Sequence, residues 1–81
     1  MYSIKNKRIL LVGASGVLGS EYADFLHKNG AKLIMSDVNN KRFRKVIKKN
    51  NKAKHLFCDL LNTNEIIKMV KSSAKFFNGL D

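Results

Sequence analysis

The sequence predicts an α/β fold with the element order βαβαβα, in which three parallel strands carry helices on both faces. Short apolar runs alternate with stretches whose apolar residues recur at helical spacing. A strand that leads through a helix to the next strand pairs with it in parallel, through a right-handed crossover. The length of 81 residues allows one small domain at most.

The first strand and the first helix are the most clearly marked elements. Residues 8–12 (RILLV) form a continuous apolar run that ends at a glycine, which is typical of a strand buried on both faces. A helix is predicted from Val17 to Asn29, and Gly30 is expected to cap it. Its buried face is expected to consist of Leu18, Tyr22, Phe25 and Leu26. The residues expected to point away are Glu21, Asp24 and Lys28.

Two further strand and helix pairs follow along the chain. Ala31 to Met35 is an apolar run that closes at Ser36 and Asp37, and it precedes a helix over Lys41 to Asn50. The helix is expected to bury Phe43, Val46 and Ile47.

The third strand is expected from Ala53 to Cys58. Asn62 and Glu65 have the residue types of a capping box, so a third helix should start there. Gly79 is expected to end that helix. Its apolar stripe is expected to be Ile66, Ile67, Val70, Ala74 and Phe77.

Composition excludes several other classes of protein. Hydrophobic residues make up 44% and charged residues 27%, which argues against a wholly disordered chain. The single cysteine, Cys58, rules out an internal disulfide, and no Cys/His set has metal-ligand spacing. No apolar stretch approaches the roughly 20 residues that span a bilayer. A soluble, cytoplasmic protein without a metal and without a membrane partner is therefore expected.

The charge balance predicts a second class of function. Lys and Arg total 16 against six acidic residues, a formal net charge of +10, so a polyanion-binding or nucleic-acid-binding module is the alternative reading. The cationic residues gather between Lys41 and Lys54, with only Phe43 as an interleaved aromatic. A solvated outer helix face is favoured for this segment, and nucleic acid is not expected as the main partner.

The sharpest motif is the glycine-rich turn at residues 13–19 (GASGVLG), between the first strand and the first helix. In such a turn the first glycine permits a tight reversal, the second lets backbone N–H groups approach a pyrophosphate, and the third permits close helix packing. The helix N-terminus adds partial positive charge. Ser15 is a candidate phosphate donor.

Asp37 stands eighteen residues after Gly19, at the end of the second strand, close to the interval of about 20 residues expected of a ribose-binding acid. A carboxylate there accepts hydrogen bonds from a free 2′-hydroxyl and repels a 2′-phosphate, so NAD is favoured over NADP. Lys41 and Arg42 follow closely and keep NADP open.

The chain resembles the N-terminal, cofactor-binding part of a short-chain dehydrogenase/reductase. The resemblance covers residues 7–81 and rests on residues 11–19 (LVGASGVLG), on Asp37 and on residues 58–60 (CDL). It implies a Rossmann-like, doubly wound domain of which residues 1–81 form the first mononucleotide-binding half. It also implies that Asp59 contacts the adenine. The expected cofactor-binding residues are Gly13, Ser15, Gly16, Val17, Leu18, Gly19, Asp37, Asp59 and Leu60.

The sequence departs from the family in three respects. Val12 stands where the family has threonine, and the glycine spacing resembles the extended branch. The catalytic tyrosine followed four residues later by lysine is missing, since Asn6 follows Tyr2 and Leu26 follows Tyr22 at that distance.

The resemblance implies hydride transfer between NAD(P) and an alcohol or ketone in the full-length parent. Residues 16–22 resemble members that modify bacterial surface sugars and flagellin, so a sugar derivative is one implied substrate. No catalytic residue is expected in this chain, which looks like a fragment without turnover; an inactive truncated gene product is a further alternative. Exposed apolar residues near Phe76 and Phe77 predict self-association into a homo-oligomer.

Overall fold

The computed structural model describes residues 3–81, so Tyr2 lies outside the described residues. The strands are β1 (Arg8–Val12), β2 (Lys32–Asp37) and β3 (Lys54–Phe57). The helices are α1 (Val17–Lys28), α2 (Lys41–Lys49) and α3 (Thr63–Phe76). The predicted order of six elements is therefore confirmed, and β3 is one residue shorter at each end than expected.

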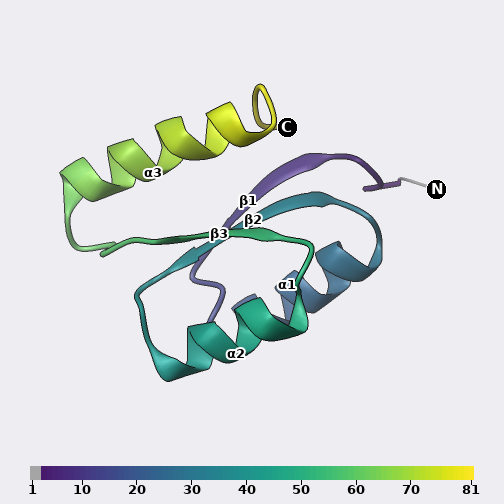
Figure 1. Ribbon diagram of the computed structural model, residues 1–81, viewed down its shortest axis with the longest axis horizontal. Coiled ribbons are helices and arrows are strands. Elements are labelled where there is room, and N and C mark those ends of the chain that lie inside the picture. Colours follow the sequence, from purple (N-terminus) through teal and green to yellow (C-terminus); the bar gives the residue numbers. More distant parts are fainter. Residues whose placement is uncertain (1–2) are drawn as a thin grey trace.

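The three strands form one parallel sheet in the order β1-β2-β3. Helices α1 and α2 lie on one face of the sheet, and α3 lies alone on the other (Figure 1). This arrangement confirms the predicted α/β architecture with helices on both faces. Because β2 has a neighbour on each side, it is the buried strand of the sheet, and all its residues after Lys32 are buried.

The prediction that residues 8–12 are buried on both faces is wrong. In β1 the first four residues are half-buried and Val12 is exposed. The physical reason is position: among residues 3–81, β1 pairs with β2 alone and forms an edge of the sheet. An apolar run shows that a strand has apolar side chains to bury. It does not show how many neighbouring strands and helices cover that strand.

Helix α1 does not bury the face that its apolar spacing predicts. Its fully buried residue is Ala23, and Leu26 packs beside the core. The other three predicted residues are more than half exposed: Leu18 65%, Tyr22 56% and Phe25 58%. The helix lies against the sheet through Gly19 and Ala23 because these small residues allow a close approach.

Asp24 of α1 points toward α2 and not away from the protein as expected. Its carboxylate accepts from Lys49 Nζ at 2.7 Å and from Asn50 Nδ2 at 3.0 Å. Asn50 is buried, so this contact fastens the end of α2 to the middle of α1. The predicted cap of α1 is confirmed: Gly30 has φ +81 and its N–H donates to His27 O.

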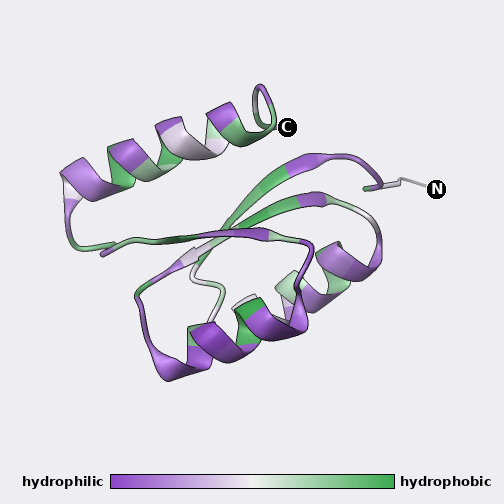
Figure 2. Cartoon of the chain, in the orientation of Figure 1, coloured by the Kyte–Doolittle hydropathy of each residue, from purple (hydrophilic) through white to green (hydrophobic). Residues whose placement is uncertain are grey.

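Helix α2 supplies the centre of the core on its side of the sheet. Phe43 is fully buried with Leu33 and Met35 of β2, and Val46 and Ile47 pack against this cluster, as predicted. Asn40 caps the helix by accepting from Phe43 N at 2.8 Å. Figure 2 shows hydrophobic colour along the middle of β1 and β2 and hydrophilic colour over most of α2.

Helix α3 also turns a different face inward from the one predicted. Met69 and Ser73 are its buried residues, while Ile67 and Val70 of the expected stripe are exposed. Because α3 has no neighbouring helix on its face of the sheet within residues 3–81, only a narrow strip of it is covered (Figure 1). Ile66, Ala74 and Phe77 of the predicted stripe are half-buried.

The start of α3 agrees with half of the predicted capping box. Asn62 Oδ1 accepts from Glu65 N at 3.2 Å, which confirms Asn62 as the cap. The reciprocal bond is absent because Asn62 N donates to Asp59 O, and Glu65 Oε1 accepts from Asp59 N instead.

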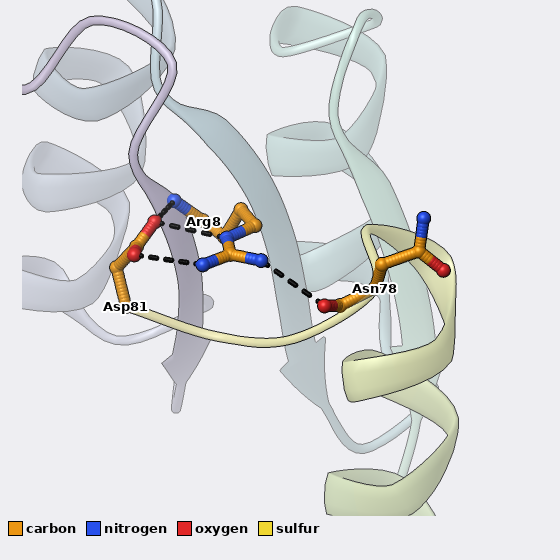
Figure 3. A network of polar contacts seen from close by, with 3 residues as sticks. All are labelled: Arg8, Asn78 and Asp81. Carbon is orange, nitrogen blue, oxygen red and sulfur yellow. Dashed lines mark hydrogen bonds and ion pairs between the residues drawn. The ribbon is translucent and has the colours of Figure 1, made fainter.

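The C-terminal residues return to β1 and bind its first residue (Figure 3). Asp81 accepts from Arg8 N at 2.7 Å and pairs with the Arg8 guanidinium at 3.0 Å, while Asp81 N donates to Arg8 O. Arg8 also donates to Asn78 O at 3.1 Å. After α3 the left-handed turn begins at Asn78, with φ 60, one residue before the predicted Gly79. These contacts hold the end of the chain along the outer edge of β1.

Candidate functional site

Three loops meet at the edge of the sheet where the parallel strands end. The loop after β1 carries the glycine turn, the loop after β2 follows Asp37, and the loop after β3 carries Asp59. Gly13 N donates to Ser36 O at 2.8 Å, and Cys58 N donates to Asp37 O at 2.9 Å. Backbone bonds therefore tie the ends of the three strands together. In open α/β sheets this edge is where ligands bind.

Gly13 makes the reversal that leaves β1. Its φ is +79, in the left-handed region that glycine adopts without steric cost. The next N–H, that of Ala14, also donates to Ser36 O, at 3.3 Å. The first glycine thus has the role in the turn that its position predicts.

Gly19 brings α1 onto the glycine turn. A Cβ added at this residue would lie 2.1 Å from Gly13 O and 3.1 Å from Ala14 Cα. Both are backbone atoms, so a side chain could enter only if the helix moved away from the turn. The third glycine is therefore required by helix packing, independently of any ligand.

Gly16 differs from the other two glycines because, among the described residues, neither its backbone angle nor the space around it requires glycine. Its φ is −67, which any residue adopts. A Cβ added there would meet only Gly13 O, at an ordinary contact distance of 3.6 Å. No other heavy atom outside its chain neighbours and its own helix lies within 4 Å of that Cβ position among the described residues.

The N-terminus of α1, which starts beside Gly16, has no side-chain cap and no acidic residue in its first turn. Helices α2 and α3 are both capped by asparagine side chains. The N–H groups of Val17, Leu18 and Gly19 have no acceptor within the helix. Uncapped N–H groups and the helix dipole together suit a phosphate group.

Asp37 and Ser15 are in direct contact. Asp37 Oδ2 accepts from Ser15 Oγ at 2.6 Å and from Ser15 N at 2.9 Å, while Oδ1 accepts from Val38 N at 2.7 Å. The expected ribose acid and the glycine turn therefore form one unit. The Ser15 hydroxyl, predicted from the sequence as a candidate phosphate donor, instead donates a hydrogen bond to this carboxylate. A carboxylate offers about four acceptor positions, so Asp37 retains acceptor capacity.

The charge state of Asp37 follows from these bonds. Asp37 is 9% exposed, and burial alone would raise the pKa of its carboxyl group. The hydrogen bonds from Ser15 Oγ, Ser15 N and Val38 N act in the opposite direction and leave the pKa below its ordinary value. The group is thus a carboxylate at neutral pH and accepts hydrogen bonds only.

The lowered carboxyl pKa values predict acid instability. The pKa values of Asp24 and Asp81 are lowered by hydrogen bonds and charge from Lys49 and Arg8 respectively, and the pKa of Asp37 is lowered, against the effect of burial, by hydrogen bonds from Ser15 and Val38. The unfolded chain, with Asp pKa near about 3.9, binds more protons below that pH, so stability rises with pH there. We expect a melting temperature that changes little between about pH 5 and 7 and falls below about pH 4.

Thermal unfolding followed by circular dichroism across this range tests the expectation, with Asp81→Asn and Asp37→Asn as comparisons. Each variant lacks one lowered carboxyl group and should show a shallower fall. An identical pH profile in the wild type and both variants would contradict the assignment.

The third loop places Asp59 and Leu60 at the same edge, one strand away from Asp37. Asp59 Oδ1 accepts from Leu61 N at 2.9 Å, which closes a local turn. Leu60 is exposed, as are Val17 and Leu18 at the start of α1. The structure shows no direct contact between Asp59 and Asp37 within residues 3–81. Sequence reasoning missed the bond between Ser15 and Asp37, since nothing local links residues 22 positions apart.

The cysteine and the two histidines of the chain make contacts that hold the fold together. Cys58 is buried, and burial together with Glu65 and Asp59 raises the pKa of its thiol, so it is a core residue. His27 Nε2 accepts from Lys52 N at 3.2 Å, and His55 lies edge-on to Phe43. Within residues 3–81 no group of His, Cys, Asp and Glu is arranged to hold a metal ion. In the same residues, none of the helices combines the length and apolar character needed to cross a membrane.

The sheet order, the crossovers and the glycine turn at the end of β1 define a Rossmann-like unit. Solved structures with the same fold include a short-chain dehydrogenase/reductase from Burkholderia phymatum in complex with NAD, at TM-score 0.88 and 17% identity. Another is a short-chain dehydrogenase from Burkholderia cenocepacia J2315 in complex with NADP, at TM-score 0.86 and 24% identity. Each alignment covers 99% of this chain, and 30% and 35% of the respective solved chains.

The family model for short chain dehydrogenases matches residues 7–81, and the chain belongs to this family. Among curated proteins it is 27% identical to "(21S)-21-acetoxyl-apo-melianone synthase SDR" from Melia azedarach and 25% identical to "Tropinone reductase-like 2" from Erythroxylum coca. Each match covers 96% of this chain and 29% of the relative. The chain therefore spans less than a third of the length of these relatives.

Proposed function

We propose that this chain is the first mononucleotide-binding half of the cofactor-binding domain of an NAD(P)-dependent oxidoreductase. In the parent protein, hydride would pass between the nicotinamide and an alcohol or ketone, with a sugar derivative as the substrate class to test first. The family membership supports the class of reaction. The neighbours solved with NAD and with NADP support a dinucleotide as the ligand, without a preference between the two.

The observation that carries the proposal is Gly16. Its backbone is unstrained and the space for a Cβ is open, so the fold does not require glycine there. A ligand that approaches the backbone closely does require it. The uncapped N–H groups of α1 follow directly after Gly16, and a pyrophosphate would satisfy both features.

Asp37 is proposed to bind the adenosine ribose. Its carboxylate carries a negative charge and is held by Ser15, so its remaining acceptor positions suit the hydroxyl groups of an unmodified ribose. The negative charge of Asp37 would repel a 2′-phosphate, which supports a preference for NAD over NADP. Asp59 and Leu60, at the end of the neighbouring strand, are proposed to line the adenine region.

The catalytic step is proposed to lie outside these residues. No tyrosine in the printed sequence is followed four residues later by lysine, the pair that would exchange a proton with the substrate oxygen. We therefore expect the 81-residue chain to bind the dinucleotide weakly and to show no turnover. Steady-state oxidation of an alcohol or sugar alcohol by the purified chain would contradict this.

The Asp37→Asn variant tests the proposed ribose contact. Loss of the negative charge should weaken NADH binding several-fold. The variant should then bind NADPH with nearly the same affinity as NADH, because the repulsion of a 2′-phosphate disappears. Titration of the intrinsic fluorescence of each reduced dinucleotide measures both affinities. An unchanged ratio of NADH to NADPH affinity in the variant would remove Asp37 from the ribose site.

A further inference from the structure

The cationic residues of the chain gather on one side of the fold. Residues 41–54 contain eight of the 16 lysines and arginines and none of the six acidic residues, which leaves a net charge of only +2 for the other residues. In the structure they occupy α2, the following turn and the first residue of β3. The hydrophilic colour of α2 in Figure 2 marks this side.

A cavity of about 570 Å³ lies at the beginning of β3, between the ends of α2 and α3. Its apolar lining comes from Ile47, Ala53 and Phe76. Its polar lining comes from Lys48, Lys54, Asn51 and His55, with no carboxylate. The volume is that of a ligand pocket, and the lining suits an anionic ligand with a flat apolar part.

Exposed aromatic side chains line the same edge of the sheet. Phe57 is 48% exposed and Phe76 is 45% exposed. His55 is also exposed, and its ring centre lies 5.5 Å from that of Phe57. A second, smaller cavity of about 180 Å³ lies beside Phe57 and is lined by both Lys68 and Glu65. Aromatic rings and lysines therefore lie together without a carboxylate in the cavity at the amino-terminal end of β3, whereas the cavity beside Phe57 also contains Glu65.

This surface is separate from the proposed dinucleotide site. The large cavity lies at the amino-terminal end of β3, whereas the glycine turn, Asp37 and Asp59 lie at the carboxyl ends of the strands. Within residues 3–81 no strand pairs with the outer edge of β3. The C-terminal segment runs along the opposite edge of the sheet, where Asp81 binds Arg8 (Figure 3).

The chemistry favours a single-stranded nucleic acid over a lipid surface. Helix α2 has no exposed large apolar residue, so its basic face offers none to insert between lipids, and the exposed aromatic residues of the surface come from β3 and α3. A positively charged groove with aromatic rings on which bases stack is the usual surface for single strands.

We propose that the β3 edge surface, formed by Lys48, Lys54, His55, Phe57 and Phe76, binds single-stranded nucleic acid. The lysine ammonium groups contact phosphates and the aromatic rings stack on bases. The sequence alone favours a solvated helix face here, because the aromatic residues of β3 and α3 lie outside the basic segment and reach it only in the folded chain.

The test is fluorescence anisotropy of a labelled 12-nucleotide oligo(dT) with the full chain, between 50 and 200 mM salt. The double variant Lys48→Ala/Lys54→Ala should bind at least fivefold more weakly at 50 mM salt. Its slope of log affinity against log salt should be shallower by about 1.4, for two lost phosphate contacts on a single strand. Phe76→Leu should lower affinity and leave the slope unchanged, since it removes stacking alone.

The matched control is Lys28→Ala/Lys71→Ala, which removes two exposed lysines on α1 and α3 and gives the same net charge. It should bind within twofold of the wild type. Equal losses in both double variants would show diffuse attraction and overturn the proposal. So would tighter binding of a duplex of the same length, or binding to phosphatidylserine vesicles with none to the oligonucleotide.

Discussion

Replacing Gly19 by alanine is expected to lower the free energy of unfolding by about 3 kcal/mol, at the upper end of what overpacking costs. The added Cβ would lie 2.1 Å from Gly13 O, and a backbone oxygen cannot move without the turn or the helix. For a domain of this size, such a loss lowers the melting temperature by roughly 12–24 °C. Urea unfolding followed by circular dichroism measures it.

Two outcomes of this experiment bear on the close packing of α1 against the glycine turn. A stability loss below about 0.5 kcal/mol, the usual range for surface substitutions, would show that α1 does not approach the turn as closely as described. If Gly19→Ala does not fold in buffer alone, the same variant in the presence of a stabilising osmolyte should recover a folded but less stable chain.

Replacing Gly16 by alanine is expected to have the opposite pattern, with a small effect on folding and a large effect on binding. The backbone at Gly16 suits alanine, and the new Cβ would lie 3.6 Å from Gly13 O. We expect a stability change below about 1 kcal/mol, the typical cost of alanine at a helix N-cap. Dinucleotide affinity should fall at least tenfold, about 1.4 kcal/mol, because the methyl group blocks the approach to the N–H groups.

Ser20→Ala is the matched control for Gly16→Ala. Ser20 also lies at the start of α1, where its hydroxyl donates to Val17 O and has no role in the proposed site. It should leave NADH affinity within twofold of the wild type. If Gly16→Ala also binds NADH like the wild type, the glycine turn is only a structural element.

The order and type of the elements could be predicted from the sequence because each depends on local pattern. Apolar runs, helical spacing and the caps at Asn62 and Gly30 are readable within about ten residues. Which face of a helix is buried depends on the elements that pack against that helix. Apolar spacing favours Leu18, Tyr22 and Phe25 as the inner face of α1, yet the close approach at Gly19 turns Ala23 inward.

In the candidate site, too, local sequence patterns could be predicted and contacts between distant residues could not. The glycine turn and Asp37 stand out in the sequence because their spacing is a known combination. The hydrogen bonds from Ser15 to Asp37 cannot be read there, since they join residues of different loops. The cavity at the start of β3 joins residues of α2, β3 and α3, and its composition emerges only in the folded chain.

The measurement that tests the central claim most directly is a titration of the ¹⁵N-labelled chain with NAD⁺, followed by amide chemical shifts. We expect shifts that begin at Gly13 to Gly19 and extend to Asp37 and Asp59, in the loops that meet at the carboxyl edge of the sheet. Shifts confined to residues 41–54, or no shifts at millimolar NAD⁺, would contradict dinucleotide binding at the glycine turn.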